Sequence, residues 1–373
     1  MSLSSRDACM VWTAMVVLTA TACGPSQSGS SGSSNDSSVN AAAVSSAKAA
    51  VAKLLERPKT LHVEDLPSKP TPGKTIDFVA CGLPVCVAFG ADVQKAARAV
   101  GWNYKLLNAG GTPETIAAAY DQAVRDNPGG VIGSGGFSPS LFSNQLSQLA
   151  AAHVPVMLNV VDSNAPGITG IILDKSFVEE SGKEMGQWIL ADSNGKNAHI
   201  AIISTPLTPI YAAAHAGLEG VIKDGCTSCS IDTYSSFQFA DIGTTLPAGI
   251  VTYLTSHPNV NYLFFDFNLE VNGVPAALDT AGLAKRVKIT STDITQPEAG
   301  YLKDGTMAAT SANPWVEAMW GAVDGILRAD QKATAAPIQW PHQILNGSNL
   351  VSLDRYPLVE NYESTFKAAW KVG

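Results

Sequence analysis

Basic residues are scarce in this chain of 373 residues. It holds 24 Lys and Arg against 32 Asp and Glu, which gives a net charge of −8 and an isoelectric point near 5.2. A protein that binds nucleic acid needs a basic face to displace the counterions of the phosphates. The composition therefore argues against a nucleic-acid partner.

Long apolar runs are also nearly absent, and the one at the start is short. Residues 9–22 carry no charge and follow Arg6. A permanent membrane span needs about 20 apolar residues, whereas a shorter run suits a secretory signal peptide. Small residues at positions 20–22 precede Cys23, which resembles the bacterial lipobox. We expect a lipoprotein signal peptide over 1–22 and an acylated Cys23 that anchors an extracytoplasmic protein to the bacterial cell membrane. The alternative is an ordinary signal peptide with an incidental cysteine.

The segment after Cys23 has little with which to form a core. Residues 24–46 have too few apolar side chains to offset the entropy lost on ordering. We expect residues 23–73 to form a flexible Ser- and Gly-rich tether that ends in a short helical lead-in. About 330 residues remain beyond the first ~45, which is enough for two domains.

Catalytic and cofactor motifs are missing. The histidines are scattered and form no HExxH pattern for zinc, and no GxSxG motif occurs. The triplet Gly73-Lys-Thr75 resembles the end of a phosphate-binding loop, but Ser68 stands where that loop needs glycine, and a strand follows. We therefore expect no metal, no cofactor and no enzyme, with a secreted enzyme as the least favoured alternative.

Cysteines are few and mostly paired. Beyond Cys9 and Cys23, the remaining four form two close pairs, Cys81 with Cys86 and Cys226 with Cys229. Close pairs in an exported protein are typical of local disulfides. A metal or redox site and free thiols are the alternatives. We favour the disulfides because the two pairs are far apart in the sequence and the CxxC pair lies in a turn before a strand.

From residue 75 onward, short apolar runs alternate with longer amphipathic ones. The runs predict strands at 75–80, 102–107, 130–132, 154–160, 199–203, 231–234, 262–265 and 287–291. The amphipathic segments predict helices at 87–100, after Thr112-Pro113, and at 141–151, 177–190, 211–223, 246–256 and 271–281. This alternation indicates an α/β protein with parallel sheets covered on both faces.

The count of strands predicts two lobes. The break falls at 171–174, so we expect two doubly wound parallel-sheet lobes, one formed by 74–173 plus 314–341 and the other by 174–313 plus 342–373. Such sheets bind ligands beyond the carboxyl ends of their strands. Those ends carry residues 81–86, 133–137, Asn159, 266–268 and Asp293.

Several short segments along residues 74–330 form a recognisable series. In chain order they are Leu83-Pro-Val-Cys86, 91–97, 154–159, Thr292-Asp293, 304–310 and Asn313. In their order and spacing, these segments resemble the type I periplasmic binding proteins, and within them the ribose-binding-like substrate-binding proteins of ABC importers.

The departures from the family bear on the ligand. Where sugar-binding relatives have an arginine, this chain has Gly217, and where they have Asp-Arg it has Asn159-Val160. Phe267 stands in place of an asparagine. The absence of these arginines argues against an anionic ligand. A sugar remains the first expectation, and a nucleoside, a polyol, an amine or an apolar ring compound stays open.

The resemblance implies a ligand site made of polar, aromatic and apolar side chains. Carboxylates and amides bind hydroxyl or amine groups, and aromatic faces stack on rings. The expected ligand-binding residues are Leu83, Val85, Phe137, Asn159, Tyr211, Asp266, Phe267, Asn268, Asp293, Asn313 and Trp315.

The resemblance also implies a mechanism. We expect a monomer whose lobes, joined by a multi-strand hinge near Asp174, Asn313 and Pro341, close on a sugar or sugar-like molecule and deliver it to an ABC permease. The alternative is a receptor of the same fold that signals to a chemotaxis or two-component system.

Overall fold

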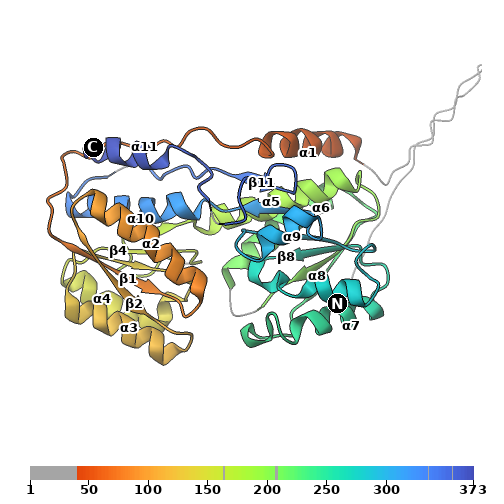
Figure 1. The fold of residues 1–373 in the computed structure, drawn as a ribbon, viewed down its shortest axis with the longest axis horizontal. Helices are drawn as coiled ribbons and strands as arrows, with labels where there is room; N and C mark the ends of the chain where they lie inside the picture. Colours follow the sequence, from red (N-terminus) through yellow and green to blue (C-terminus); the bar gives the residue numbers. More distant parts are fainter. Residues whose placement is uncertain (1–39, 163, 206–208, 335, 355) are drawn as a thin grey trace, which may run out of the picture. The chain divides into compact units, whose positions relative to one another are not determined.

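Two parallel sheets organise this chain (Figure 1). The structure is a computed structural model that describes residues 40–162, 164–205, 209–334, 336–354 and 356–373. The predicted signal peptide and Cys23 lie outside the described residues. Within these residues, no helix is long and apolar enough to cross a membrane.

The first lobe is built on five parallel strands in the order β2-β1-β3-β4-β5. The interior strand β1 is apolar but for Asp77 and Thr75, and it is buried on both faces, as parallel sheets require. The strands are β1 (Thr75–Ala80), β2 (Asn103–Asn108), β3 (Gly130–Gly133), β4 (Val156–Asn159) and β5 (Gly170–Ile172).

Helices cover both faces of this sheet. Residues Ile76 and Phe78 of β1 face α2 (Pro84–Ala99) and α10 (Trp315–Asp330). Val79 faces α3 (Pro113–Asp126) and α4 (Ser143–Ala151), which follows a short 3-10 turn, η1 (Pro139–Phe142). The predicted start of α3 is confirmed, because the Thr112 hydroxyl accepts a hydrogen bond from the Thr115 amide at 3.3 Å.

The second lobe has six strands in the order β11-β10-β9-β8-β6-β7, all parallel except β11. Helices α5 and α6 cover one face, while α7, α8 and α9 cover the other. The strands are β6 (His199–Ile203), β7 (Ser230–Tyr234), β8 (Tyr262–Phe265), β9 (Lys288–Thr292), β10 (Ala309–Ala312) and β11 (Gln343–Leu345). The helices are α5 (Lys175–Asp192), α6 (Ala212–Gly225), α7 (Leu246–Ser256), α8 (Val274–Thr280) and α9 (Glu298–Asp304), with 3-10 turns η2 (Pro209–Tyr211), η3 (Phe239–Asp241) and η4 (Asn268–Val271).

The sequence misses β5, β10 and β11. The segment 171–174 is interpreted as a break between lobes, yet Ile171 and Ile172 pair with β4 before the chain leaves the sheet. All three strands have only three or four residues, too few to show a period. The chain crosses between lobes after β5, after β10 and before β11, near Asp174, Asn313 and Pro341.

The prediction of a tether up to residue 46 is wrong for its last residues. Helix α1 (Ala41–Leu54) begins at Ala41 and packs against α5 and α6 of the second lobe (Figure 1). Residues 57–72 then run over the first lobe, where Leu66 is 1% exposed and its amide bonds to the Ala369 carbonyl at 2.8 Å. We call residues 40–73 the N-terminal strap, since they contact both lobes.

The chain's last segment also differs from the expectation that 342–373 belongs to the second lobe. Only β11 joins that sheet, while α11 (Tyr362–Ala369) packs on α10 of the first lobe. The rings of Trp320 and Trp370 stack at 5.3 Å, and the Trp370 indole donates to Asp324 at 2.8 Å. The sequence does not indicate that α11 packs on α10. The contact joins residues about 50 positions apart, and aromatic side chains such as these could pack against either lobe.

Candidate functional site

A cavity of about 500 Å³ lies between the two lobes, at the carboxyl ends of both sheets. Its volume is in the range of small-molecule sites in proteins. Loops after β1 to β4 line it from the first lobe, together with the start of α10, and loops after β6, β8 and β9 line it from the second. The lining residues are Cys81, Gly82, Leu83, Val85, Cys86, Phe89, Gly110, Gly111, Gly135, Gly136, Phe137, Asn159, Val160, Ile210, Tyr211, Phe267, Asn268, Asp293 and Trp315.

All but two of the residues expected to bind ligand line this cavity. Asp266 does not, because its buried carboxylate turns to His215, with 2.7 Å between Oδ2 and Nε2. Asn313 does not either, although it sits where the chain crosses between lobes after β10. The fold thus collects residues from most of the chain at one place.

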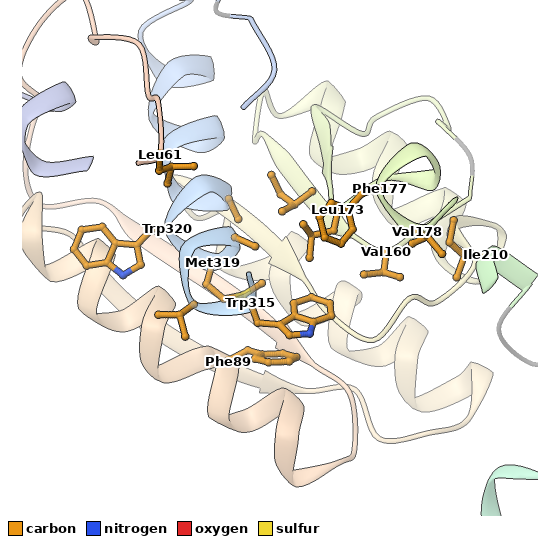
Figure 2. Close-up of a cluster of buried hydrophobic side chains, with 14 of the residues drawn as sticks. Leu61, Phe89, Val160, Leu173, Phe177, Val178, Ile210, Trp315, Met319 and Trp320 are labelled. Carbon is orange, nitrogen blue, oxygen red and sulfur yellow. The ribbon is translucent and has the colours of Figure 1, made fainter. Parts of the chain in front are cut away.

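The sequence misses Phe89, Val160 and Ile210 as lining residues. Phe89 lies on α2 about one helical turn after Val85, so the two side chains share one face of the helix. The 3.6-residue period of the helix could therefore have predicted Phe89 from Val85. Its ring stacks on Trp315, with 4.6 Å between centroids and 24° between planes (Figure 2). Val160 and Ile210 lie in loops, where no period exists to reveal them.

A disulfide shapes the first loop of the cavity. Cys81 follows β1, Cys86 lies in the first turn of α2, and the two are bonded with 5.4 Å between their Cα atoms. Cys226 and Cys229 are also bonded, in the turn between α6 and β7, which is away from the cavity. Both predicted disulfides are therefore present in the structure, and the metal, redox and free-thiol alternatives do not describe it.

Asp293 is held in place from several directions. Its Oδ1 accepts from the Ile294 amide at 2.7 Å, and its Oδ2 accepts from the indole of Trp315 at 2.6 Å. Its own carbonyl accepts from the Thr310 hydroxyl at 2.6 Å. The backbone at Asp293 is left-handed, with φ at 68°. The carboxylate caps no helix, since α9 starts at Glu298, and the hydrogen bonds from Ile294 and Trp315 set its orientation.

Asn159 and Asn268 are the two amides at the cavity. Asn159 is 1% exposed, and its Oδ1 has no hydrogen-bond partner among the described residues. The Asn268 amide nitrogen donates to Thr295 at 2.7 Å and to Glu298 at 3.1 Å. The amide nitrogen of Asn268 is therefore already hydrogen-bonded within the second lobe, whereas Oδ1 of Asn159 is an acceptor that a ligand could use.

Several acidic groups lie at and behind the second-lobe wall. Burial first, and then the carboxylates of Asp293, Asp266 and Glu270, raise the pKa of Tyr211 well above its ordinary value. Burial also raises the pKa of Glu270, and the neighbouring Asp266 adds to this. Among the described residues that line the cavity, Asp293 alone carries a charge, and no Lys, Arg or His is present.

The structure corrects the interpretation of Gly217 as the site of a lost ligand-binding arginine. Gly217 lies on α6 against α5, where a Cβ atom would come within 2.1 Å of the Glu179 carbonyl oxygen. Position 217 therefore serves close packing of two helices and does not line the cavity. Short motifs aligned without a structure do not distinguish a packing glycine from a replaced ligand contact.

A larger hollow of about 1180 Å³ lies at the other end of the first-lobe sheet. Four of its charged side chains form two pairs, Lys74 with Asp330 and Lys105 with Asp126, while Asp77 and Lys332 also line it. Among the described residues, no group of His, Cys, Asp and Glu is placed to hold a metal ion.

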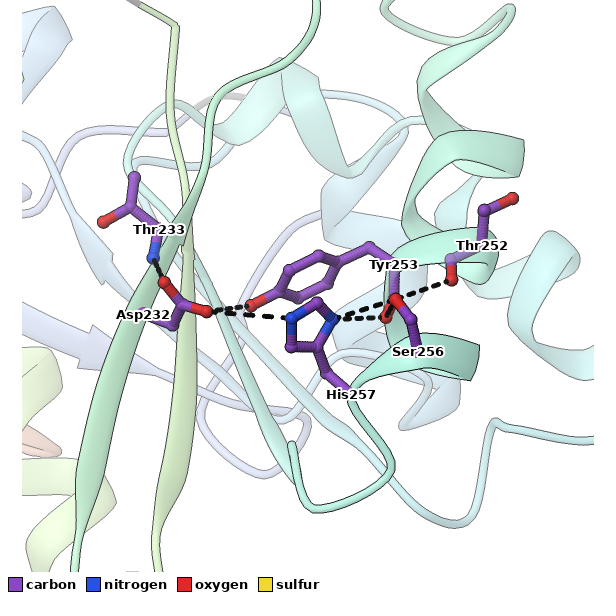
Figure 3. Close-up of polar contacts among 6 residues, drawn as sticks. All are labelled: Asp232, Thr233, Thr252, Tyr253, Ser256 and His257. Carbon is purple, nitrogen blue, oxygen red and sulfur yellow. Dashed lines mark hydrogen bonds and ion pairs between the residues drawn. The ribbon is translucent and has the colours of Figure 1, made fainter.

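Another polar cluster joins β7 to the end of α7 on the surface of the second lobe (Figure 3). Ser256, His257 and Asp232 meet there, with 3.0 Å between the serine hydroxyl and Nδ1 of the histidine. The Ser256 hydroxyl lies 2.9 Å from the carbonyl of Tyr253, to which it donates, and Tyr253 donates to Asp232 at 3.1 Å. The serine proton is thus bound to the helix backbone, so the cluster fastens an edge strand and lacks the arrangement of a catalytic triad.

Comparison with protein-family models matches residues 82–330 to the periplasmic binding protein domain. No curated protein matches the chain in sequence. Among solved structures, the glucose-galactose binding protein GanP from Geobacillus stearothermophilus is 16% identical with a TM-score of 0.65, over 76% of this chain and 100% of that one. A periplasmic ribose ABC transporter protein from Conexibacter woesei is 17% identical with a TM-score of 0.65, over 76% and 95%.

A third similar structure, an ABC transporter solute binding protein from Agrobacterium vitis with bound allitol, is 15% identical with a TM-score of 0.63, over 79% and 99%. Likeness at these identities shows the fold. The family match covers more than half of the chain and agrees with the two parallel-sheet lobes and the cavity between them. The chain therefore belongs to the periplasmic binding protein family, with the type I fold.

Proposed function

We propose that this protein captures a small molecule, a sugar or a sugar-like compound, and delivers it to an ABC import permease. The observation that carries the proposal is the cavity lined from both lobes. A ligand that contacts both walls binds the closed arrangement better than an open one, so it draws the lobes together. The permease then recognises the closed form.

The names of the similar proteins support import. They are described as a glucose-galactose binding protein, a ribose ABC transporter protein and a solute binding protein with bound allitol. These descriptions favour transport over the alternative of a chemotaxis or two-component receptor. They also support a binding protein over a secreted enzyme.

We propose that the cavity residues named in the sequence analysis contact the ligand, with Asp293 as the central polar contact. A thermal-shift screen of sugars, polyols, nucleosides and amines tests this. A ligand at 100 times its dissociation constant stabilises the fold by about 2.7 kcal/mol. Asp293→Ala should abolish the response to a hit, while Asp279→Ala, an exposed change on α8, should keep it.

Lobe closure is tested by small-angle scattering with and without the hit. We expect a smaller radius of gyration with ligand. Identical profiles at saturation would contradict closure.

We further propose that the mature protein begins at an acylated Cys23 and works as a lipid-anchored monomer. A single acyl chain binds membranes only marginally, so stable retention requires multiple acylation. Mass spectrometry of the membrane fraction should find a lipid-modified N-terminal cysteine, and Cys23→Ala should release the protein or leave it unprocessed. An unmodified N-terminus at another residue would contradict the anchor.

A further inference from the structure

The two walls of the cavity differ in polarity. The second-lobe wall carries three polar side chains, Tyr211, Asn268 and Asp293, beside Ile210 and Phe267. The first-lobe wall consists of apolar and aromatic side chains, a disulfide and glycines. Its apolar and aromatic members are Leu83, Val85, Phe89, Phe137, Val160 and Trp315. Apart from the indole nitrogen of Trp315, Asn159 supplies the one polar side chain among the described residues of this wall.

The first-lobe wall has few groups left to bind the hydroxyls of a sugar. The indole of Trp315 donates to Asp293 at 2.6 Å. The Gly82 amide donates to the Gly110 carbonyl at 2.8 Å, and the Gly110 amide donates to the side chain of Asn108 at 2.9 Å. Oδ1 of Asn159 is buried with no hydrogen-bond partner among the described residues, so it remains as an acceptor.

This shortage of polar groups decides what lies against the first lobe. A sugar ring on this wall would lose the water bound to its hydroxyls and gain few hydrogen bonds in return, which is costly. An aromatic ring has no such requirement, and its burial is favourable in proportion to its apolar area.

The aromatic side chains of the first-lobe wall add specific contacts for a ring. Phe89 and Trp315 stack with 4.6 Å between centroids and 24° between planes (Figure 2). The ring of Phe137 lies in the loop after β3 at the same cavity. Aromatic rings pack on one another in offset or edge-to-face arrangements, and these contribute beyond the area that they bury.

The volume of the cavity allows for more than one ring. At about 500 Å³ it falls in the range of sites that take drug-sized ligands. A sugar at the second-lobe wall therefore leaves space for a second ring at the first-lobe wall.

From these observations we infer that the ligand is an aryl glycoside, a sugar whose anomeric oxygen carries an aromatic ring. The aromatic ring lies against the first-lobe wall, and the sugar hydroxyls face the polar side chains of the second lobe. The inference rests on the proposed function and narrows its ligand class. Because each part of such a ligand matches a different wall, the ligand binds the closed arrangement better than either lobe alone.

Calorimetric titration of the purified protein with matched glycosides tests the inference. Phenyl glycosides of glucose, galactose and xylose are compared with the methyl glycosides of the same sugars and anomers, which keep the sugar and lack the aromatic ring. Phenol represents the aromatic part alone. We expect a phenyl glycoside to bind at least 30-fold more tightly than its methyl counterpart and than phenol.

Val160→Asn places a polar amide in the first-lobe wall. The backbone at Val160 is left-handed, with φ at 52°, a conformation that asparagine adopts more readily than valine. The variant should weaken binding of the phenyl glycoside at least tenfold and change binding of the methyl glycoside by less than threefold. Val351→Asn, the same change at a side chain that is 59% exposed, should bind like the parent. Circular dichroism and the thermal midpoint establish that both variants are folded.

The outcomes separate the two proposals. If methyl glycosides bind as tightly as their phenyl counterparts, the inference of an aryl glycoside is overturned and solute capture stands. If phenol alone binds as tightly as the phenyl glycosides, the sugar makes no contribution and the inference also fails. If Val160→Asn affects phenyl and methyl glycosides alike, the aromatic ring does not lie against the first lobe and the inference is wrong. If none of these compounds binds or compacts the protein, the inference and the proposed sugar-like ligand both fail.

Discussion

The indole of Trp315 donates a 2.6 Å hydrogen bond to Asp293, and this bond joins the two lobes at the cavity. Trp315 opens α10 of the first lobe, and Asp293 follows β9 of the second. The same indole ring stacks on Phe89 (Figure 2). One side chain therefore ties the aromatic wall of one lobe to the carboxylate of the other.

Trp315→Phe tests this link. The phenyl ring keeps the stacking on Phe89 and loses the donor to Asp293. A hydrogen bond to a charged group contributes about 1.5–3 kcal/mol, so we expect the ligand to bind about 10- to 150-fold more weakly. Calorimetry measures the affinity, and scattering should show a wider lobe spacing. Phe89→Leu is the control, since it removes the stack and keeps the hydrogen bond; if both variants bind alike, the hydrogen bond has no special role.

Asp293 is also subject to a backbone requirement. At φ 68°, an alanine is strained by about 1–2 kcal/mol, whereas glycine is not. We expect Asp293→Ala to have a lower free energy of unfolding than Asp293→Gly by roughly 1 kcal/mol, with ligand binding lost in both. Urea denaturation measures the difference. Equal stabilities would show that the loop relaxes to an ordinary conformation.

The two disulfides should differ in function. Replacing Cys81 and Cys86 by serine should lower stability by less than the typical ~2–4 kcal/mol, because the closed loop is short. Ligand affinity should fall, since the bond shapes a loop that lines the cavity. The matched pair of changes at Cys226 and Cys229 should leave affinity unchanged. Loss of affinity in both double variants would point to a general effect on the fold.

The N-terminal strap should stabilise the folded unit. Leu66 is 1% exposed, and its replacement by alanine should cost about 2–4 kcal/mol, which chemical denaturation measures. Val351→Ala, at a side chain that is 59% exposed, should change stability by less than about 0.5 kcal/mol. A neutral Leu66→Ala would mean that the strap is not held against the first lobe.

Glu317 makes stability depend on pH. Burial raises its pKa from 4.5 to about 7, although the Val359 amide donates to it at 2.7 Å. Between these values the folded chain holds a proton that the unfolded chain releases, so stability should fall as the pH rises from 4.5 to 7.

Glu317→Gln should remove a large part of that dependence. Relative to the parent, its free energy of unfolding should be higher by up to ~3 kcal/mol at pH 8 and little changed at pH 4.5. Thermal unfolding across this range measures it, and Asp77, whose pKa is also raised to about 7, accounts for a remaining slope. Glu179→Gln, on an exposed position of α5, is the control. A parallel pH profile in Glu317→Gln and the parent would contradict the assignment.

Local pattern predicts the buried strands and the long helices well. Strands β1, β6 and β8 and helix α7 match their predicted ranges to the residue, because each is a short apolar run or a clear amphipathic period between turn signals. The carboxyl ends of these strands also predicted most of the cavity, since parallel sheets place such ends together. The prediction that Asp266 lines the cavity is wrong, because the fold brings His215 beside its carboxylate and the sequence gives no sign of this contact.

The sequence by itself determined the alternation of strands and helices, the two lobes and the edge at which the cavity lies. These follow from short apolar runs, from the 3.6-residue period of the helices and from the geometry of parallel sheets. Only the tertiary structure decided that Trp315 bonds to Asp293, that Gly217 packs against α5, that the N-terminal strap contacts both lobes and that α11 packs on the first lobe. Each of these depends on contacts between distant segments, whose partners are chosen by packing and hydrogen bonding in space and leave no period in the chain.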